Sequence, residues 1–341
     1  MIKLLAYFAI ILAFILVFQL MRIYQLSAEL KGKHVGKADD GDNRSQGRVM
    51  IWFVLAFFAC LIWLLFDAQG KMLPPAASDV GVTSDNVFLF NWVIIFIVFF
   101  ATTFLLFYFP FRYKKQKDSK AYFYPHNDKL ELIWTVVPSI ALAVIIIYGL
   151  SLWAKITGTP DAKSMVVQIY AKQFDFTARY AGTDNILGKT DYRLIDDASN
   201  NTLGMDSTDP HGWDDIVASS ELHIPVNTPI LFKCNARDVM HGIYFPHFRD
   251  QINCVPGMTT EIHFTPTITT DEMRKITHDT AFDYILLCNR VCGSGHYNMH
   301  MKVVVDSPDE FKKWMAQQHP FYKHLYDMHH NSPGGGATAM K

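Results

Sequence analysis

The fold is decided by one stretch, Leu286-Leu287-Cys288-Asn289-Arg290-Val291-Cys292-Gly293-Ser294-Gly295-His296-Tyr297-Asn298-Met299. It places two thiols, an imidazole and a thioether within 12 residues, directly after a run typical of a β-strand. Soft sulfur ligands combined with imidazole favour copper or zinc over hard cations. The C-x3-C spacing differs from the C-x2-C zinc knuckle, and a mononuclear blue-copper loop uses one cysteine. Two cysteines on one loop can instead bridge two copper ions.

Each copper ion of such a pair needs terminal ligands of its own. His296 and Met299 supply two of them, and the backbone carbonyl of Arg290 lies between the cysteines. A second histidine must come from another strand, and His241 is the best candidate. The alternative is a disulfide between Cys288 and Cys292, which an oxidising compartment permits.

The composition divides the chain into a membrane part and a polar part. Half of the 341 residues are hydrophobic and 18% are charged, below the roughly 25% of a soluble protein. The net charge of −1 excludes a strongly basic nucleic-acid binder, so no nucleic acid is expected as a partner. Twelve of the 14 histidines and four of the five cysteines follow residue 155.

Four apolar runs in the first part predict four transmembrane helices, because each is near the ~20 residues that cross a bilayer. They are Leu4–Leu20, Val49–Phe66, Val87–Phe109 and Leu132–Trp153. Segments 22–48 and 110–131 each carry six Lys or Arg residues, whereas 67–86 carries only Lys71. The positive-inside rule therefore places those two segments in the cytoplasm and residues 154–341 outside. A cleaved signal peptide at 1–26 would invert this order, so we expect a retained helix.

The second part predicts an all-β sandwich or barrel, because short β-branched runs alternate with turn residues. The runs are Met165–Tyr170, Phe174–Tyr180, Glu221–Pro225, Ile230–Cys234, Thr260–Phe264, Tyr284–Leu287 and Met301–Val305. The Asp-rich segment 182–221 is expected to be an exposed loop or small excursion. The His- and Gly-rich end, 319–341, is expected to be a flexible tail.

Three motifs resemble subunit II of haem–copper cytochrome c oxidases, whose dinuclear CuA centre lies in a cupredoxin domain. The first is C-x3-C-G-x-x-H-x-x-M, from Cys288 to Met299. The second is D-V-x-H at 238–241, with Pro246 five residues after the histidine and then P-G-x-x-T from Pro256. The third is H-N-x-x-L-E-x-x-W-T-x-x-P at 126–138, entering the last apolar run.

The resemblance implies a ligand set and two further roles. Cys288 and Cys292 would bridge both coppers, and the terminal ligands would be His241, His296, Met299 and the Arg290 carbonyl. Glu131 would lie at the cytoplasmic entrance of a proton-uptake path. Phe174 would occupy the electron-entry position, where the family has a tryptophan.

Two departures from the family pattern carry predictions. Arg290 and Asn253 replace the family's usual Glu and Asp, so we expect the interfacial magnesium site of the family to be absent. Cys234 and Cys254, outside the metal motifs, are candidates for a disulfide. The family normally has two membrane spans, so residues 1–67 are expected to form an extra helical hairpin. The remaining predicted parts are a two-helix anchor at 87–154, a cupredoxin-like CuA domain at 160–318 and the tail at 319–341.

The expected function is that of the electron-entry subunit of a cytochrome c oxidase. It would accept electrons from a c-type cytochrome at CuA and pass them to haem in catalytic subunit I, where O2 is reduced to water with proton translocation. Subunit III is a further expected partner, and the donor is either separate or held within a supercomplex. The absence of C-x-x-C-H predicts that no haem c is attached to this chain. The expected location is the bacterial inner membrane, with the CuA domain on the periplasmic side.

Two alternatives remain open at this point. One is the CuA subunit of a nitric oxide reductase of the same superfamily. The other is a membrane-anchored copper-binding protein without redox turnover.

Overall fold

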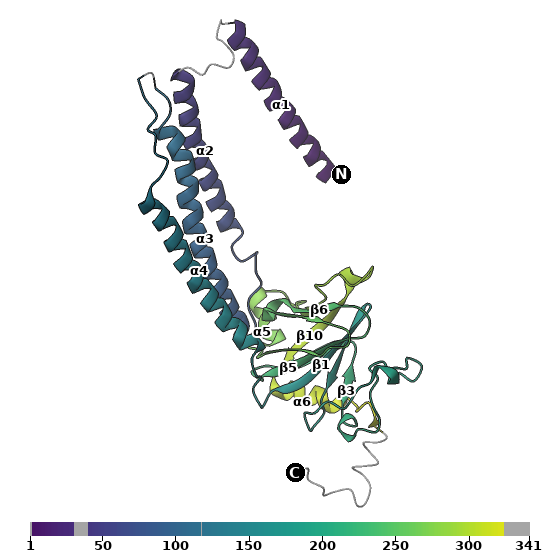
Figure 1. The fold of residues 1–341 in the computed structure, drawn as a ribbon. Helices are drawn as coiled ribbons and strands as arrows, with labels where there is room; N and C mark the ends of the chain where they lie inside the picture. The colour runs from purple at the N-terminus through teal and green to yellow at the C-terminus, as the bar shows by residue number, and fades with distance from the viewer. Residues whose placement is uncertain (1, 31–39, 117, 324–341) are drawn as a thin grey trace, which may run out of the picture. The chain divides into compact units, whose positions relative to one another are not determined.

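The computed structural model describes residues 2–30, 40–116 and 118–323, with side chains from residue 11 onward (Figure 1). The chain divides into two compact units. One comprises Met1–Gln69 and Ile95–Asn127, and the other comprises Gly70–Ile94 and Asp128–Lys341.

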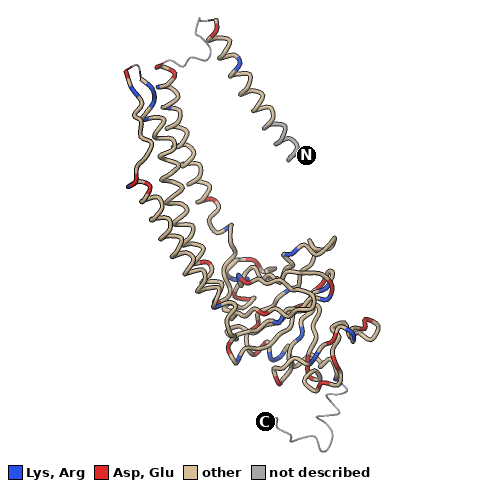
Figure 2. The backbone as a smooth tube through the Cα atoms, viewed as in Figure 1, with Lys and Arg blue, Asp and Glu red and all other residues tan. Residues whose placement is uncertain are grey.

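Four long helices confirm the four predicted spans. They are α1 (Ile2–Leu30), α2 (Asp40–Asp67), α3 (Asp79–Arg112) and α4 (Asp128–Thr157). Each contains a window that is long and apolar enough to cross a membrane. Long uncharged stretches run through α2, α3 and α4 (Figure 2). The chain is therefore a membrane protein with several spans.

Within the helical unit, α2 packs against α3 through aromatic rings. Phe53 lies 5.2 Å from Phe107 and Phe58 lies 4.8 Å from Phe100, measured between ring centroids. Gly47 approaches the backbone of Phe111 closely, because it has no side chain to keep the helices apart.

The polar part is a β-sandwich of two five-stranded sheets, as predicted. The first sheet has the order β3-β2-β1-β5-β8 and the second has the order β4-β10-β9-β6-β7. The strands of the first sheet are β3 (Ile216–Ala218), β2 (Asp175–Tyr180), β1 (Met165–Lys172), β5 (Ile230–Ala236) and β8 (Thr260–Phe264). Those of the second are β4 (Glu221–Pro225), β10 (His300–Asp306), β9 (Tyr284–Leu287), β6 (His241–Phe245) and β7 (Asp250–Cys254). Two helices, α5 (Thr270–Thr277) and α6 (Pro308–Gln317), complete the domain.

The core lies between the sheets and is rich in aromatic rings. The tilted rings of Phe232 and Phe245 contact each other across the two sheets, with their centroids 5.1 Å apart, and Phe264 lies within 5.4 Å of both rings. All three side chains are at most 2% exposed. Burial of rings of this size dominates the stability of a β-sandwich core.

The prediction of an exposed loop at 182–221 is wrong in part. The segment contains β3, and the fully buried carboxylate of Asp215 pairs with the buried guanidinium of Arg179. The same carboxylate accepts a hydrogen bond from the Gly188 amide at 3.0 Å. These bonds all go to Oδ2 of Asp215, whereas its buried Oδ1 has no hydrogen-bond partner among the described residues. Composition reveals none of these contacts.

The described part of the predicted flexible tail, residues 319–323, is bound to the rest of the β-domain. The Phe321 amide donates to the Asp215 carbonyl at 2.8 Å, and the Tyr322 hydroxyl donates to the Met205 carbonyl at 2.8 Å. Residues 324–341 of that predicted tail lie outside the described residues.

Candidate metal centre

Three buried side chains converge at one edge of the second sheet. One is at the start of β6, and two are in the loop between β9 and β10. The ligand atoms of His241, Cys288 and Cys292 all lie within 4.8 Å of one another. The two sulfur atoms are 3.8 Å apart, and Nδ1 of His241 lies 4.0 Å from the Cys288 sulfur. These are the donor types of a copper-type site.

The remaining predicted ligands surround the same pair of sulfurs. Nδ1 of His296 and Sδ of Met299 each lie 3.7 Å from the Cys292 sulfur. The carbonyl oxygen of Arg290 lies 3.2 Å from the Cys288 sulfur. The structure thus brings all six predicted donor groups together.

The loop that carries five of these donors is fixed at both of its ends. It leaves β9 at Leu287 and enters β10 at His300, and these two residues pair across the strands. The Cys288 amide donates to the Met299 carbonyl at 3.1 Å, so the first and last donor residues are tied together. Between them, Gly293 has φ 138°, a conformation that a residue with a Cβ rarely adopts.

His241 begins strand β6, which sequence reasoning did not predict as a strand. Tyr244 of β6 pairs with Leu287 of β9, so His241 is held next to the ligand loop within one sheet. A Cβ on Gly242 would collide with the side chain of Asn289 and come within 3.0 Å of the Arg290 amide. Glycine at this position therefore permits the close approach of β6 to the loop.

The two loop cysteines are free thiols, and their geometry fits a metal better than a disulfide. A disulfide needs sulfurs about 2.05 Å apart. Two metal–sulfur bonds of about 2.3 Å that meet at a near-tetrahedral angle span about 3.8 Å, the observed separation. Burial, followed by the neighbouring Cys288, raises the pKa of Cys292 to about 11. Metal binding must therefore displace a proton from the Cys292 thiol.

Asp238 orients the His241 imidazole. Its Oδ1 lies 2.8 Å from Nε2 of His241, which leaves Nδ1 facing the sulfurs. Burial opposes ionisation of Asp238, but hydrogen bonds from His241 and from the amides of Gln173 and Val239 lower its pKa. A carboxylate behind a metal-binding histidine fixes the ring and its tautomer.

Gln173 and Phe174 contact the ligand loop from the other sheet. Nε2 of Gln173 donates to the Cys292 carbonyl at 2.6 Å. The Phe174 ring covers Gly293 and Gly295, since a Cβ on Gly295 would lie 2.6 Å from the ring. The ring is 38% exposed, so it touches both the loop and the solvent. Sequence reasoning selected Phe174 but missed the part played by Gln173, its neighbour in the Gln173-Phe174-Asp175-Phe176 segment.

Other predicted residues lie apart from this cluster. Glu131 is exposed in the first turn of α4. The side chain of Arg290 and that of Asn253 are exposed. Cys234 and Cys254 are buried free thiols, so the candidate disulfide is not formed in the structure. Cys254 pairs with His241 across β6 and β7.

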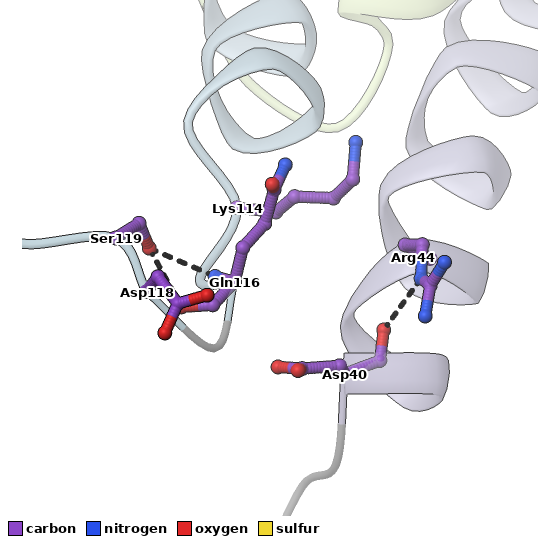
Figure 3. Close-up of a pocket in the computed structure, with 6 residues that line it drawn as sticks. All are labelled: Asp40, Arg44, Lys114, Gln116, Asp118 and Ser119. Carbon is purple, nitrogen blue, oxygen red and sulfur yellow. Dashed lines mark hydrogen bonds between the residues drawn. The ribbon is translucent and has the colours of Figure 1, made fainter.

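A separate pocket lies in the helical unit and contains none of the predicted site residues (Figure 3). Its lining comes from the start of α2 and the segment after α3. The residues are Asp40, Arg44, Lys114, Gln116, Asp118 and Ser119.

The chain is similar in sequence to proteins of one known family. Residues 67–152 match the family described as "Cytochrome C oxidase subunit II, transmembrane domain". The "Alternative cytochrome c oxidase subunit 2" of Bradyrhizobium diazoefficiens is 32% identical over 273 residues, which cover 77% of this chain and 93% of that protein. The "Cytochrome c oxidase subunit 2" of Thermostichus vulcanus is 24% identical over 83% of this chain and 91% of its own length.

A solved structure is also similar, the periplasmic domain of subunit II of cytochrome oxidase (CoxB) of Bradyrhizobium japonicum. It aligns with 22% identity over 47% of this chain and 94% of its own, at a TM-score of 0.31. At that score the assignment rests on the sequence match to the Bradyrhizobium diazoefficiens protein and on the copper-type donor set. On those grounds the chain belongs to the subunit II family of the cytochrome c oxidases.

Proposed function

We propose that this chain is the electron-entry subunit of a haem–copper oxidase complex and holds a dinuclear copper centre. The observation that carries the proposal is the convergence of four further donor groups on two thiols 3.8 Å apart. When bound, such a centre supplies a one-electron carrier whose charge is spread over two metals and two thiolates.

The protein residues would keep that centre rigid and dry. Cys288, Cys292, His241, His296, Met299 and the Arg290 carbonyl would together hold the metals. Cys288, Cys292 and Met299 are at most 8% exposed, and His241 is fully buried. Burial of this kind excludes water and limits the rearrangement that accompanies a change of charge.

The proposed metal centre implies where electrons enter and leave the chain, and the family resemblance implies where protons are taken up. Electrons would enter near Phe174 from a c-type cytochrome and leave toward haem in the catalytic subunit, where O2 would be reduced. The charge asymmetry of the loops favours a periplasmic copper domain and a cytoplasmic Glu131. Glu131 would then lie at the entrance of a proton-uptake path.

Electron paramagnetic resonance and copper counting on the purified complex test the proposal. We expect two copper ions per chain and a mixed-valence signal. Met299→Leu and His241→Ala should change that signal and its near-infrared band, whereas Met301→Leu and His263→Ala should not. An unchanged signal in both ligand variants would contradict the assignment, and haem A in the same preparation would identify the partner as an oxidase.

The exposed guanidinium of Arg290 supports a further part of the proposal, the absence of interfacial magnesium. A cation in place of a carboxylate repels Mg²⁺, and Asn253 supplies no charge. Metal analysis of the complex should find neither magnesium nor manganese next to Arg290. A bound ion there would overturn this part alone.

A further inference from the structure

We infer that the β6–β7 hairpin fastens the metal centre to membrane helix α3, with Arg249 and Asp85 as positioning residues. One end of the hairpin carries His241. The other end, residues 246–249, contacts the start of α3 and the segment before it. This inference rests on the proposed electron transfer to a membrane partner.

The contact between Arg249 and Asp85 is bidentate, with the Arg249 side chain largely buried and that of Asp85 36% exposed. Nε of Arg249 lies 2.8 Å from one carboxylate oxygen of Asp85, and Nη2 lies 3.1 Å from the other. The Arg249 side chain is 11% exposed. Paired hydrogen bonds of this type fix both distance and direction.

Arg249 also binds two backbone carbonyls. Nη1 donates to the Pro246 carbonyl at 2.6 Å, and Nη2 donates to the Pro74 carbonyl at 2.5 Å. The residue has φ 56°, a left-handed conformation that non-glycine residues rarely adopt. That conformation turns the chain from Phe248 into β7.

Backbone contacts of the same hairpin end reinforce this attachment. The Ala77 amide donates to the His247 carbonyl at 2.8 Å, and the Ser78 hydroxyl donates to the Phe248 carbonyl at 2.7 Å. Ser78 is fully buried, and its hydroxyl also accepts the Gly81 amide at the start of α3. Three consecutive hairpin residues, 247–249, are therefore bound to the segment 74–85.

The other end of the hairpin reaches the metal ligands directly. His241 pairs with Cys254, and Phe245 pairs with Asp250, so five residue pairs join the two strands without a bulge. A displacement of 246–249 would be transmitted through this ladder to His241. The structure thus links the start of α3, residues 79–85, to the metal ligand His241 through one short, paired element.

The test uses the intact complex and the variants Asp85→Asn and Ser78→Ala. Asp85→Glu keeps the charge, and Glu261→Gln removes an exposed ion pair of the same domain that does not contact α3. Light-driven injection of one electron into the copper centre measures the rate of its onward transfer to haem. Misplacement of reacting groups by about 1 Å can cost up to about 100-fold, so a partly released hairpin should slow transfer by about three- to tenfold.

We expect Asp85→Asn and Ser78→Ala to slow this transfer while their copper signal stays that of the wild type. Asp85→Glu should retain most of the wild-type transfer rate, and Glu261→Gln should leave that rate unchanged. A wild-type transfer rate in both Asp85→Asn and Ser78→Ala would overturn the inference, as would a changed copper signal that accounts for the slower rate. Absence of a copper signal in the wild type would instead refute the proposed function, before any variant is compared.

Discussion

The imidazole of His241 is held between Asp238 and Cys288. Its Nε2 lies 2.8 Å from the Asp238 carboxylate, and its Nδ1 lies 4.0 Å from the Cys288 sulfur. The Asp238 carboxylate also accepts a hydrogen bond, at 2.8 Å, from the amide of Gln173, which lies in the turn between β1 and β2. The carboxylate therefore connects the histidine ligand to the segment that covers the ligand loop.

Asp238→Asn should weaken copper binding without unfolding the domain. Loss of a carboxylate partner behind a histidine ligand typically costs 10–100-fold in metal affinity. Competition with a copper chelator measures the change, and Asp175→Asn provides an exposed control whose carboxylate accepts the Phe176 amide of its own strand. Equal affinity in wild type and Asp238→Asn would show that the carboxylate does not orient the ligand.

Phe174→Ala should slow electron entry from the donor while leaving the copper signal intact. The ring lies on Gly293 and Gly295 and is partly exposed, so it can contact a docked partner and the loop together. We expect kcat/KM for the donor cytochrome to fall about tenfold, and Phe174→Trp to retain the activity. Tyr192→Ala removes another exposed aromatic ring of the same domain and serves as the control. Donor kinetics that do not change in Phe174→Ala would move the entry point elsewhere.

From the sequence it was possible to predict which donor groups the fold brings together, and to predict the strands that carry a regular pattern. Strand β9 ends at Leu287, as expected, because a continuous apolar run stops there, directly before the first cysteine. Strand β6, His241–Phe245, was missed. A glycine after His241 and a proline at its end made the same stretch look like a turn.

The contacts that orient the site could not be predicted, because they join residues distant in sequence. Asp238 meets Gln173 across 65 positions, and Arg249 meets Asp85 across 164. No local pattern in either pair indicates its partner. The buried pair of Arg179 and Asp215 was hidden for the same reason within a segment that composition marks as acidic and exposed.

Glu131→Gln should lower oxidase turnover severalfold while leaving the copper signal unchanged. The carboxylate is exposed in the first turn of α4, so its removal should disturb neither the helix nor the copper domain. Asp128→Asn changes a second exposed carboxylate of the same turn and is the matched control. Proton uptake measured with the reconstituted complex reports the effect. Equal turnover in Glu131→Gln and Asp128→Asn would remove Glu131 from the proton path.

Asp250→Asn should flatten the dependence of stability on pH. Burial, reinforced by Asp79, raises the pKa of Asp250 to about 7, against 3.8 for an unperturbed carboxyl. The folded state therefore holds this proton more tightly than the unfolded state, so stability falls as pH rises from about 4 to about 7. The shift corresponds to about 4 kcal/mol at most. Burial lowers the pKa of His247 to about 4, which acts in the opposite direction over part of this range.

The comparison of wild type with Asp250→Asn separates these two groups, because His247 is present in both. Thermal unfolding of the full-length chain, followed by circular dichroism from pH 4 to pH 8, measures the difference. The wild type should lose stability relative to Asp250→Asn as pH rises, and the exposed Asp309→Asn variant should follow the wild type. A difference that does not change with pH would show that Asp250 is ionised in the folded protein, where its second oxygen has no hydrogen-bond partner. A buried carboxylate left in that state is costly, and so the fold favours the protonated form.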